Sequence, residues 1–197
     1  MVDRKELYME LLEIARNSAP PAKNHLDISM AKADMLAKEY NANLEIVKFG
    51  VLLMDIKLGE AIKNNKGPEH VKMSSDFAKE FLKKSDFSEE EKEKIINCVE
   101  AHHKGVPFIC IEAEICANAD CYRFIHPFGI FTYASILSKR TDNFLEQIKS
   151  LKFKLNEKKN ILSLPKAKME LDSYYETYSK QFDEIIEYYE SINNEDC

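Results

Sequence analysis

Apolar residues recur at helical spacing along almost the whole chain. The clearest series lies in the C-terminal stretch 166–193, where apolar residues stand three or four positions apart at 171, 174, 178, 182, 185, 189 and 192. This spacing places the side chains on one face of an α-helix. The pattern predicts further helices over residues 3–17, 23–40, 44–56, 70–84, 88–103, 111–124, 130–139 and 141–159. No segment reads as a strong strand and no repeat is visible, so we predict an all-α fold.

The organisation of the chain follows from its length and from where the helical pattern breaks. A chain of 197 residues predicts a single domain covering 1–197. Residues 57–68 read as a loop because they contain two Gly, a Pro and an Asn-Asn-Lys run. Composition becomes Lys-rich after residue 140, so residues 141–193 are expected to form a helical extension. Its long aromatic helix is expected to pack on the N-terminal helix or, alternatively, to form a homodimer seam.

Charge and apolar content exclude several classes of protein. Lys and Arg number 28 against 34 Asp and Glu, for a net charge of −6, so nucleic acid is an unlikely partner. The Gly-rich loops that hold nucleotide phosphates are absent. The longest apolar stretch, Phe49–Met54, is far shorter than the roughly 20 residues that cross a bilayer. Because the N-terminus is charged, we expect no signal peptide and a cytoplasmic location without membrane contact.

Five cysteines stand at 98, 110, 116, 121 and 197. Their number is odd and four lie in apolar segments, which favours reduced thiols that pack as small apolar side chains. A structural zinc site formed by Cys98, Cys110, Cys116 and Cys121 with His102 is the competing interpretation. The sequence has no C-x2-C pair, so the spacing supports zinc only weakly.

The distribution of His and Asp is the most informative feature for function. Asp55 ends an apolar helix and Asp120 lies within another, and a carboxylate among core residues is costly to bury without a partner. A metal ion or a histidine pair is the usual compensation. Taken singly, each His or Asp could instead be a surface residue or a group at a helix end. Their joint order is more specific: His25, Asp55, His70, His102-His103 and Asp120.

This order resembles the HD-domain superfamily of metal-dependent phosphohydrolases over about residues 20–140. His25, in Asn24-His25-Leu26, stands where the family has its first His. The helix end Leu52-Leu53-Met54-Asp55-Ile56 is similar to the family's Leu-Leu-His-Asp-Ile. The stretches 69–75, 95–102 and 112–120 are similar to the segments that carry the later His residues and the last Asp. The resemblance implies an HD-like helical bundle with an additional long C-terminal helix.

The resemblance also implies roles for individual residues. His25, Asp55 and Asp120 would bind a divalent ion such as Mn, Ni, Fe, Zn or Mg. Asp55 would also orient the attacking water, while His70 and His102 would bind substrate phosphate or donate a proton to the leaving oxygen. Candidate phosphate contacts are Lys72 and Arg123, although both residue types are more often ordinary surface charges. His103 is expected to face solvent, and His126 beside Pro127 is expected to be a turn residue.

One position departs from the family pattern. The His of the His-Asp pair is Met54 here, which leaves three of the four ligands. A thioether is a poor ligand for hard divalent ions, although three ligands can hold a catalytic metal with water in the open positions. We therefore expect a metal-dependent phosphohydrolase acting on a small phosphorylated molecule such as a nucleotide. The rivals are a catalytically impaired HD-like domain that binds a ligand or a protein partner, favoured by Met54, and a helical interaction module built on the C-terminal arm.

Overall fold

The computed structural model describes residues 2–18 and 23–194 of the chain. Within these ranges every regular element is helical, apart from one isolated bridge between Val2 and Ser85. The all-α prediction is confirmed. The elements are α1 (Arg4–Asn17), α2 (Lys23–Glu39), α3 (Leu44–Leu53), α4 (Leu58–Lys63), the 3-10 turn η1 (Gly67–Glu69), α5 (His70–Leu82), α6 (Glu89–Glu100), α7 (Ile111–Ile125), α8 (Pro127–Leu137), α9 (Phe144–Lys159) and α10 (Pro165–Asn194).

Polar caps explain where several helices begin. The Asn43 side chain accepts hydrogen bonds from the first backbone amides of α3, and Asn143 does the same for α9. Ser88 and Glu91 form a reciprocal capping box at the start of α6. His126 caps α8 and confirms its expected turn position. With Pro127 as its first residue, α8 begins three positions before the predicted residue 130.

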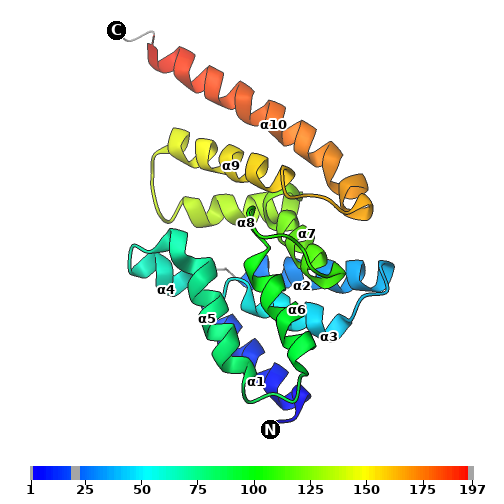
Figure 1. Ribbon diagram of the computed structural model, residues 1–197. Helices are drawn as coiled ribbons and strands as arrows, with labels where there is room; N and C mark the ends of the chain where they lie inside the picture. The colour runs from blue at the N-terminus through cyan, green and yellow to red at the C-terminus, as the bar shows by residue number, and fades with distance from the viewer. Residues whose placement is uncertain (1, 19–22, 195–197) are drawn as a thin grey trace. The chain divides into compact units, whose positions relative to one another are not determined.

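The chain divides into two compact units, Met1–Ala119 and Asp120–Cys197, and the continuous helix α7 runs through the division. In the first unit, α3 contacts α1, α2, α5 and α6 (Figure 1). Apolar side chains cover almost its whole circumference, from Ile46 to Leu53, and nearly all are buried. Helix α3, predicted over residues 44–56, is therefore the central helix of this unit, and its C-terminal end leads directly into Asp55. The single-domain interpretation stays a prediction.

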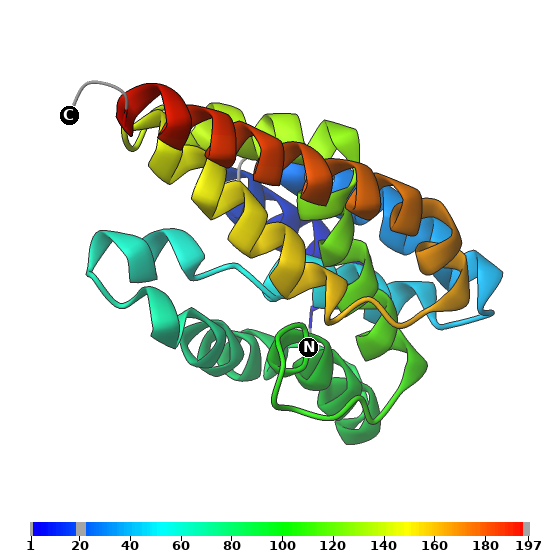
Figure 2. The same ribbon diagram turned by 90° about the horizontal axis from the view of Figure 1, so that it is seen from above.

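In the second unit, α9 contacts both α8 and α10, and Figure 2 shows α9 and α10 running side by side. The aromatic series of α10 is buried only in part: Leu171 and Phe182 are covered, while Tyr188 and Ile192 are exposed. Packing on α9 therefore buries only some of the apolar and aromatic side chains of α10. A homodimer through this helix stays a prediction.

The predicted loop 57–68 is wrong in detail, because it contains α4 and η1. Helix α4 is only six residues long and buries a single side chain, Ala61, so it offers no apolar period to read. An ion pair between Lys57 and Glu60 supports its first turn. None of the helices in the described ranges combines the length and the apolarity that crossing a bilayer requires.

Candidate metal centre

Three histidines and one aspartate come together in the first unit. His70 is the first residue of α5, His102 and His103 lie in the turn after α6, and Asp55 lies in the turn after α3. One ring nitrogen of each histidine lies within 4.8 Å of the others. Asp55 Oδ1 is 3.5 Å from Nε2 of His70 and 3.5 Å from Nε2 of His102. We call these four residues the histidine–aspartate cluster.

Hydrogen bonds from neighbouring residues hold the cluster's three turns in place. The buried Ser74 hydroxyl of α5 accepts the Lys57 amide, which fixes the turn that carries Asp55. Asn97 closes the turn after α6, because its side chain donates to the Pro107 carbonyl and accepts from the Ile109 amide. Glu100 accepts hydrogen bonds from Ser75 and Lys79 and so joins α6 to α5. The scaffold therefore fixes the positions of the segments that carry the cluster.

Backbone carbonyls define how two of the imidazoles are protonated. His70 Nδ1 lies 2.7 Å from the Gly67 carbonyl, and His102 Nδ1 lies 2.6 Å from the Val99 carbonyl. Because a carbonyl can only accept, each Nδ1 carries the proton, and a neutral ring then presents Nε2 as an acceptor. Both Nε2 atoms face the Asp55 carboxylate. In this state the Nε2 atoms of His70 and His102 converge with the Asp55 carboxylate, an arrangement that suits a cation.

The clearest open acceptor in the cluster is His102 Nε2. The side chain is fully buried, and within the described part of the chain this nitrogen has no hydrogen-bond partner. Such an atom is costly unless a ligand satisfies it. The Nε2 atoms of His70 and His103 are 3.3 Å apart. Ligand atoms around a tetrahedral ion with bonds of about 2.1 Å lie about 3.4 Å apart, so these distances fit a divalent metal.

The structure brings together three of the residues singled out in the sequence: Asp55, His70 and His102. The expectation that His103 faces solvent is wrong, because its ring is half-buried and contacts both His70 and His102. That expectation applied helical geometry to adjacent positions. Helix α6 ends at Glu100, so the rotation of about 100° per residue no longer holds at positions 102 and 103.

His25 and Met54 belong to the same unit. His25 is buried on α2, a helix that packs along α3. Met54 directly follows α3 and is also buried, with 1% of its surface exposed. Met54 therefore takes part in the packing around the end of α3, and the role of His25 as a ligand stays a prediction.

Asp120 lies in the second unit and is neutralised there by two cations. Its Oδ1 accepts from Arg123 Nη1 at 2.7 Å, and its Oδ2 is 2.6 Å from Lys158 Nζ of α9. All three side chains are buried. Burial, the largest single influence, lowers the pKa of Lys158, but the charge and hydrogen bond of Asp120, together with Cys121 and Glu157, outweigh it and raise that pKa above its ordinary value. Lys158 was not recognised in the sequence, because it stands in a Lys-rich stretch.

The two predicted phosphate contacts already hold carboxylate partners. Lys72 is exposed on α5 and pairs with Asp76 one turn later. Arg123 is buried against Asp120. Their proposed contact with substrate stays a prediction.

Cysteines take no part in the cluster. Among the described residues, the metal-competent group contains histidines alone, which gives no support to the structural zinc interpretation. Cys98, Cys116 and Cys121 are buried free thiols, and burial raises the pKa of Cys98 and of Cys121. They pack as small apolar side chains. Cys197 lies outside the described residues.

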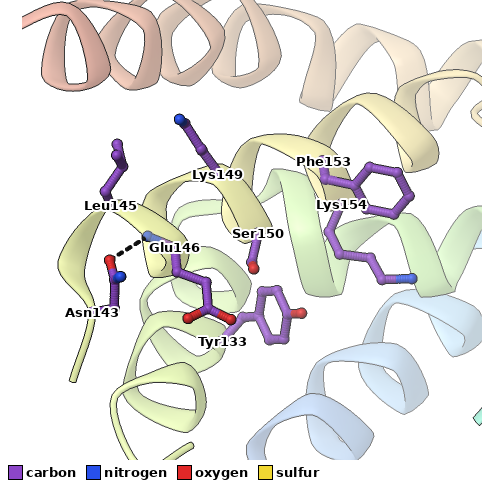
Figure 3. Close-up of a pocket in the computed structure, with 8 residues that line it drawn as sticks. All are labelled: Tyr133, Asn143, Leu145, Glu146, Lys149, Ser150, Phe153 and Lys154. Carbon is purple, nitrogen blue, oxygen red and sulfur yellow. Dashed lines mark hydrogen bonds between the residues drawn. The ribbon is translucent and has the colours of Figure 1, made fainter. Parts of the chain in front are cut away.

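A separate cavity of about 460 Å³ lies between α8 and α9 (Figure 3). Tyr133 from α8 and Phe153 from α9 contribute apolar walls. Its lysines are paired with acids, Lys149 with Glu190 and Lys154 with Glu157. The cavity thus has no convergent set of open polar groups comparable to the histidine–aspartate cluster.

Part of the chain is similar to proteins described as ribonuclease Y. The match is 35% identical over 105 residues for Finegoldia magna, 34% over 122 residues for Fusobacterium nucleatum and 29% over 119 residues for Treponema denticola. These matches cover 53%, 61% and 60% of this chain. They cover only 18–22% of the relatives, so the chain corresponds to about a fifth of their length. No family model matches the sequence.

A solved structure extends the likeness to the whole fold. The crystal structure of a predicted HD superfamily hydrolase from an uncultured Thermotogales bacterium superposes with a TM-score of 0.62. The alignment covers 94% of this chain and 92% of that one, at 14% sequence identity. At that identity the likeness establishes the fold. The chain therefore has the HD-domain fold that the order of its His and Asp residues predicted.

Proposed function

We propose that this protein is a metal-dependent phosphohydrolase whose divalent ion is held by Asp55, His70, His102 and His103. The observation that carries the proposal is the buried Nε2 of His102, which faces Asp55 with no hydrogen-bond partner among the described residues. The surrounding ligand types, imidazole and carboxylate, suit Mn, Fe, Ni or Zn. The fold of a predicted HD superfamily hydrolase agrees with this assignment.

Each residue of the cluster has a defined task in this proposal. Asp55 supplies the negative charge, and the three imidazoles supply neutral nitrogen ligands. The Gly67 and Val99 carbonyls hold the rings of His70 and His102 in the tautomer that leaves Nε2 open. A bound divalent ion would polarise a phosphoryl oxygen and lower the pKa of a water molecule. His70 and His103 are half-buried while His102 is buried, so we expect a substrate to approach the ion from the side of the two half-buried rings.

The substrate we propose is a small phosphorylated molecule such as a nucleotide. A second candidate is a phosphodiester of RNA, which the similarity to proteins described as ribonuclease Y favours. The net charge of −6 argues against broad affinity for nucleic acid. Both substrates require the same hydrolytic centre, so one set of variants tests both.

The test combines metal analysis with an activity screen on the full chain. Purified protein is loaded separately with Mn, Ni, Mg and Zn and then assayed on phosphomonoesters, nucleotides and a short single-stranded oligoribonucleotide. Asp55→Asn keeps the shape of the side chain and removes its charge, so we expect a loss of roughly 100-fold or more in activity. A blank screen on folded, metal-loaded protein would overturn the enzymatic proposal in favour of a ligand-binding domain.

Two matched variants control for trivial effects of these substitutions. Asp76→Asn removes an exposed carboxylate on α5 that pairs with Lys72. His126→Asn removes an imidazole in the second unit, and asparagine is itself a good helix cap. Both should retain activity. If either loses as much as Asp55→Asn, the loss does not report on the cluster.

A further inference from the structure

A buried charged triad stands where the order of His and Asp residues predicts the last metal ligand. Asp120 and Lys158 each have 1% of their surface exposed, and Arg123 has 3%. The two carboxylate oxygens of Asp120 are divided between the two cations, Oδ1 with Arg123 and Oδ2 with Lys158. The ammonium of Lys158 is also 3.5 Å from Glu157 Oε1. All four residues belong to the second unit.

The charges in this triad are mutually dependent. A buried ammonium is stable only beside a negative charge, and a buried carboxylate needs a cation in turn. A divalent ion bound directly to Asp120 would lie close to the Lys158 ammonium, and two cations at such separation repel strongly where water is excluded. The local charge of Asp120 is therefore already balanced without a metal ion.

We infer that Lys158 acts as the built-in counterion of Asp120 in place of a metal ion. On this inference, the proposed divalent ion is held by the histidine–aspartate cluster without Asp120 as a ligand. This inference rests on the proposed function for the location of the metal, but the ion pair can be tested without any metal. It assigns the α9 helix of the C-terminal extension a positioning role, since Lys158 is the second-last residue of α9.

The first experiment measures thermal unfolding of metal-free protein in a double-mutant cycle. Lys158→Met leaves Asp120 without one of its cations, and we expect the melting temperature to fall by about 10 °C. Asp120→Asn should also lower it. Adding Asp120→Asn to Lys158→Met removes both charges of the pair, so the double variant should lose much less than the sum of the single variants. Additive losses would overturn the inference, and the double variant keeps the test valid if Lys158→Met alone does not fold.

The second experiment measures Mn binding by calorimetry in wild type, Asp55→Asn and Asp120→Asn. We expect Asp55→Asn to weaken binding well beyond tenfold, and Asp120→Asn to change it by less than about tenfold, because the Asp120 carboxylate is held by Arg123 and Lys158 instead. Equal weakening by both variants would show that Asp120 is a ligand and would overturn the inference. If wild type binds no Mn, the proposed function fails, while the metal-free cycle still decides the role of Lys158.

Discussion

Single atoms of two backbone carbonyls decide what the candidate centre can bind. The Gly67 and Val99 oxygens accept hydrogen bonds from Nδ1 of His70 and His102, an orientation in which both Nε2 atoms face Asp55. An imidazole without such a partner could rotate or change tautomer, and would be a weaker ligand. The Val99 carbonyl also gives the fully buried His102 ring a hydrogen-bond partner at Nδ1.

Met54 is the residue at which a single change should strengthen the centre. We predict that Met54→His raises the affinity for Mn or Ni, because it adds an imidazole beside Asp55. Without metal the variant should lose about 1–3 kcal/mol of stability, since a polar ring replaces a buried thioether. Metal titration of both proteins and urea unfolding with a chelator measure the two effects. Equal affinities would mean that position 54 does not face the metal.

At the residue scale, the sequence identifies members of the candidate site more reliably than it identifies the role of each one. Asp55, His70 and His102 are recognisable because they interrupt apolar helices or stand at helix ends. The position of His103 depends on where α6 ends. The apolar periodicity of the sequence does not reveal that this helix ends at Glu100. The partnership of Asp120 with Lys158 joins residues 38 positions apart through a buried contact. No local pattern encodes it.

At the scale of helices, the close packing of α3 against α6 determines how near the residues of the histidine–aspartate cluster come to one another. Gly50 makes this approach possible, because a Cβ atom at position 50 would lie 2.5 Å from the Cys98 Cβ of α6. Helix α3 leads from Gly50 to Asp55, and α6 leads from Cys98 to His102. The separation of the two helices therefore sets the distance between Asp55 and His102.

We predict that Gly50→Ala destabilises the protein by about 1–3 kcal/mol, the usual cost of overpacking a core. Because the helices must move apart, Mn binding should weaken as well. Urea unfolding and calorimetry measure the two effects. Gly67→Ala is the matched control for the unfolding measurement alone, since a Cβ there meets no atom within 4 Å while the Gly67 carbonyl contacts His70. Unchanged stability in Gly50→Ala would show that this contact between α3 and α6 can relax without cost.

Most helices could be predicted because their apolar residues recur every three or four positions. The exceptions have physical reasons. Helix α4 buries only Ala61, so its six residues carry no period, and α8 begins at a proline that usually signals a break. A proline is tolerated there because the first helical position needs no amide donor.

Across the whole molecule, the division into two units could not be predicted. Residues 1–119 and 120–197 separate inside α7, whose helical pattern is continuous across the division. Contacts define compact units, and contacts between distant residues leave no trace in local periodicity. The sequence resemblance to HD domains covers about residues 20–140, and these bounds differ from those of the compact units because a sequence pattern does not report contacts. Asp55 and the histidine cluster fall in one unit, and Asp120 with its cations falls in the other.

This distribution predicts where metal binding should stabilise the chain. Mn at about 100 times its dissociation constant should add about 2.7 kcal/mol to the stability of the state that binds it. Hydrogen exchange should slow most in the turns after α3 and α6 and in the first turn of α5, because these segments carry the ligands. Helices α9 and α10 should change least in their local exchange.

Hydrogen exchange followed by mass spectrometry, with and without Mn, measures this map directly. Asp55→Asn is the matched control, and Mn should leave its exchange unchanged because the charge that holds the ion is gone. Slowing concentrated around Asp120 and Lys158 would contradict both the location of the centre and the role of Lys158. Slowing confined to these three segments of the first unit is expected, because they carry the four side chains that we propose as ligands, including the buried His102 Nε2.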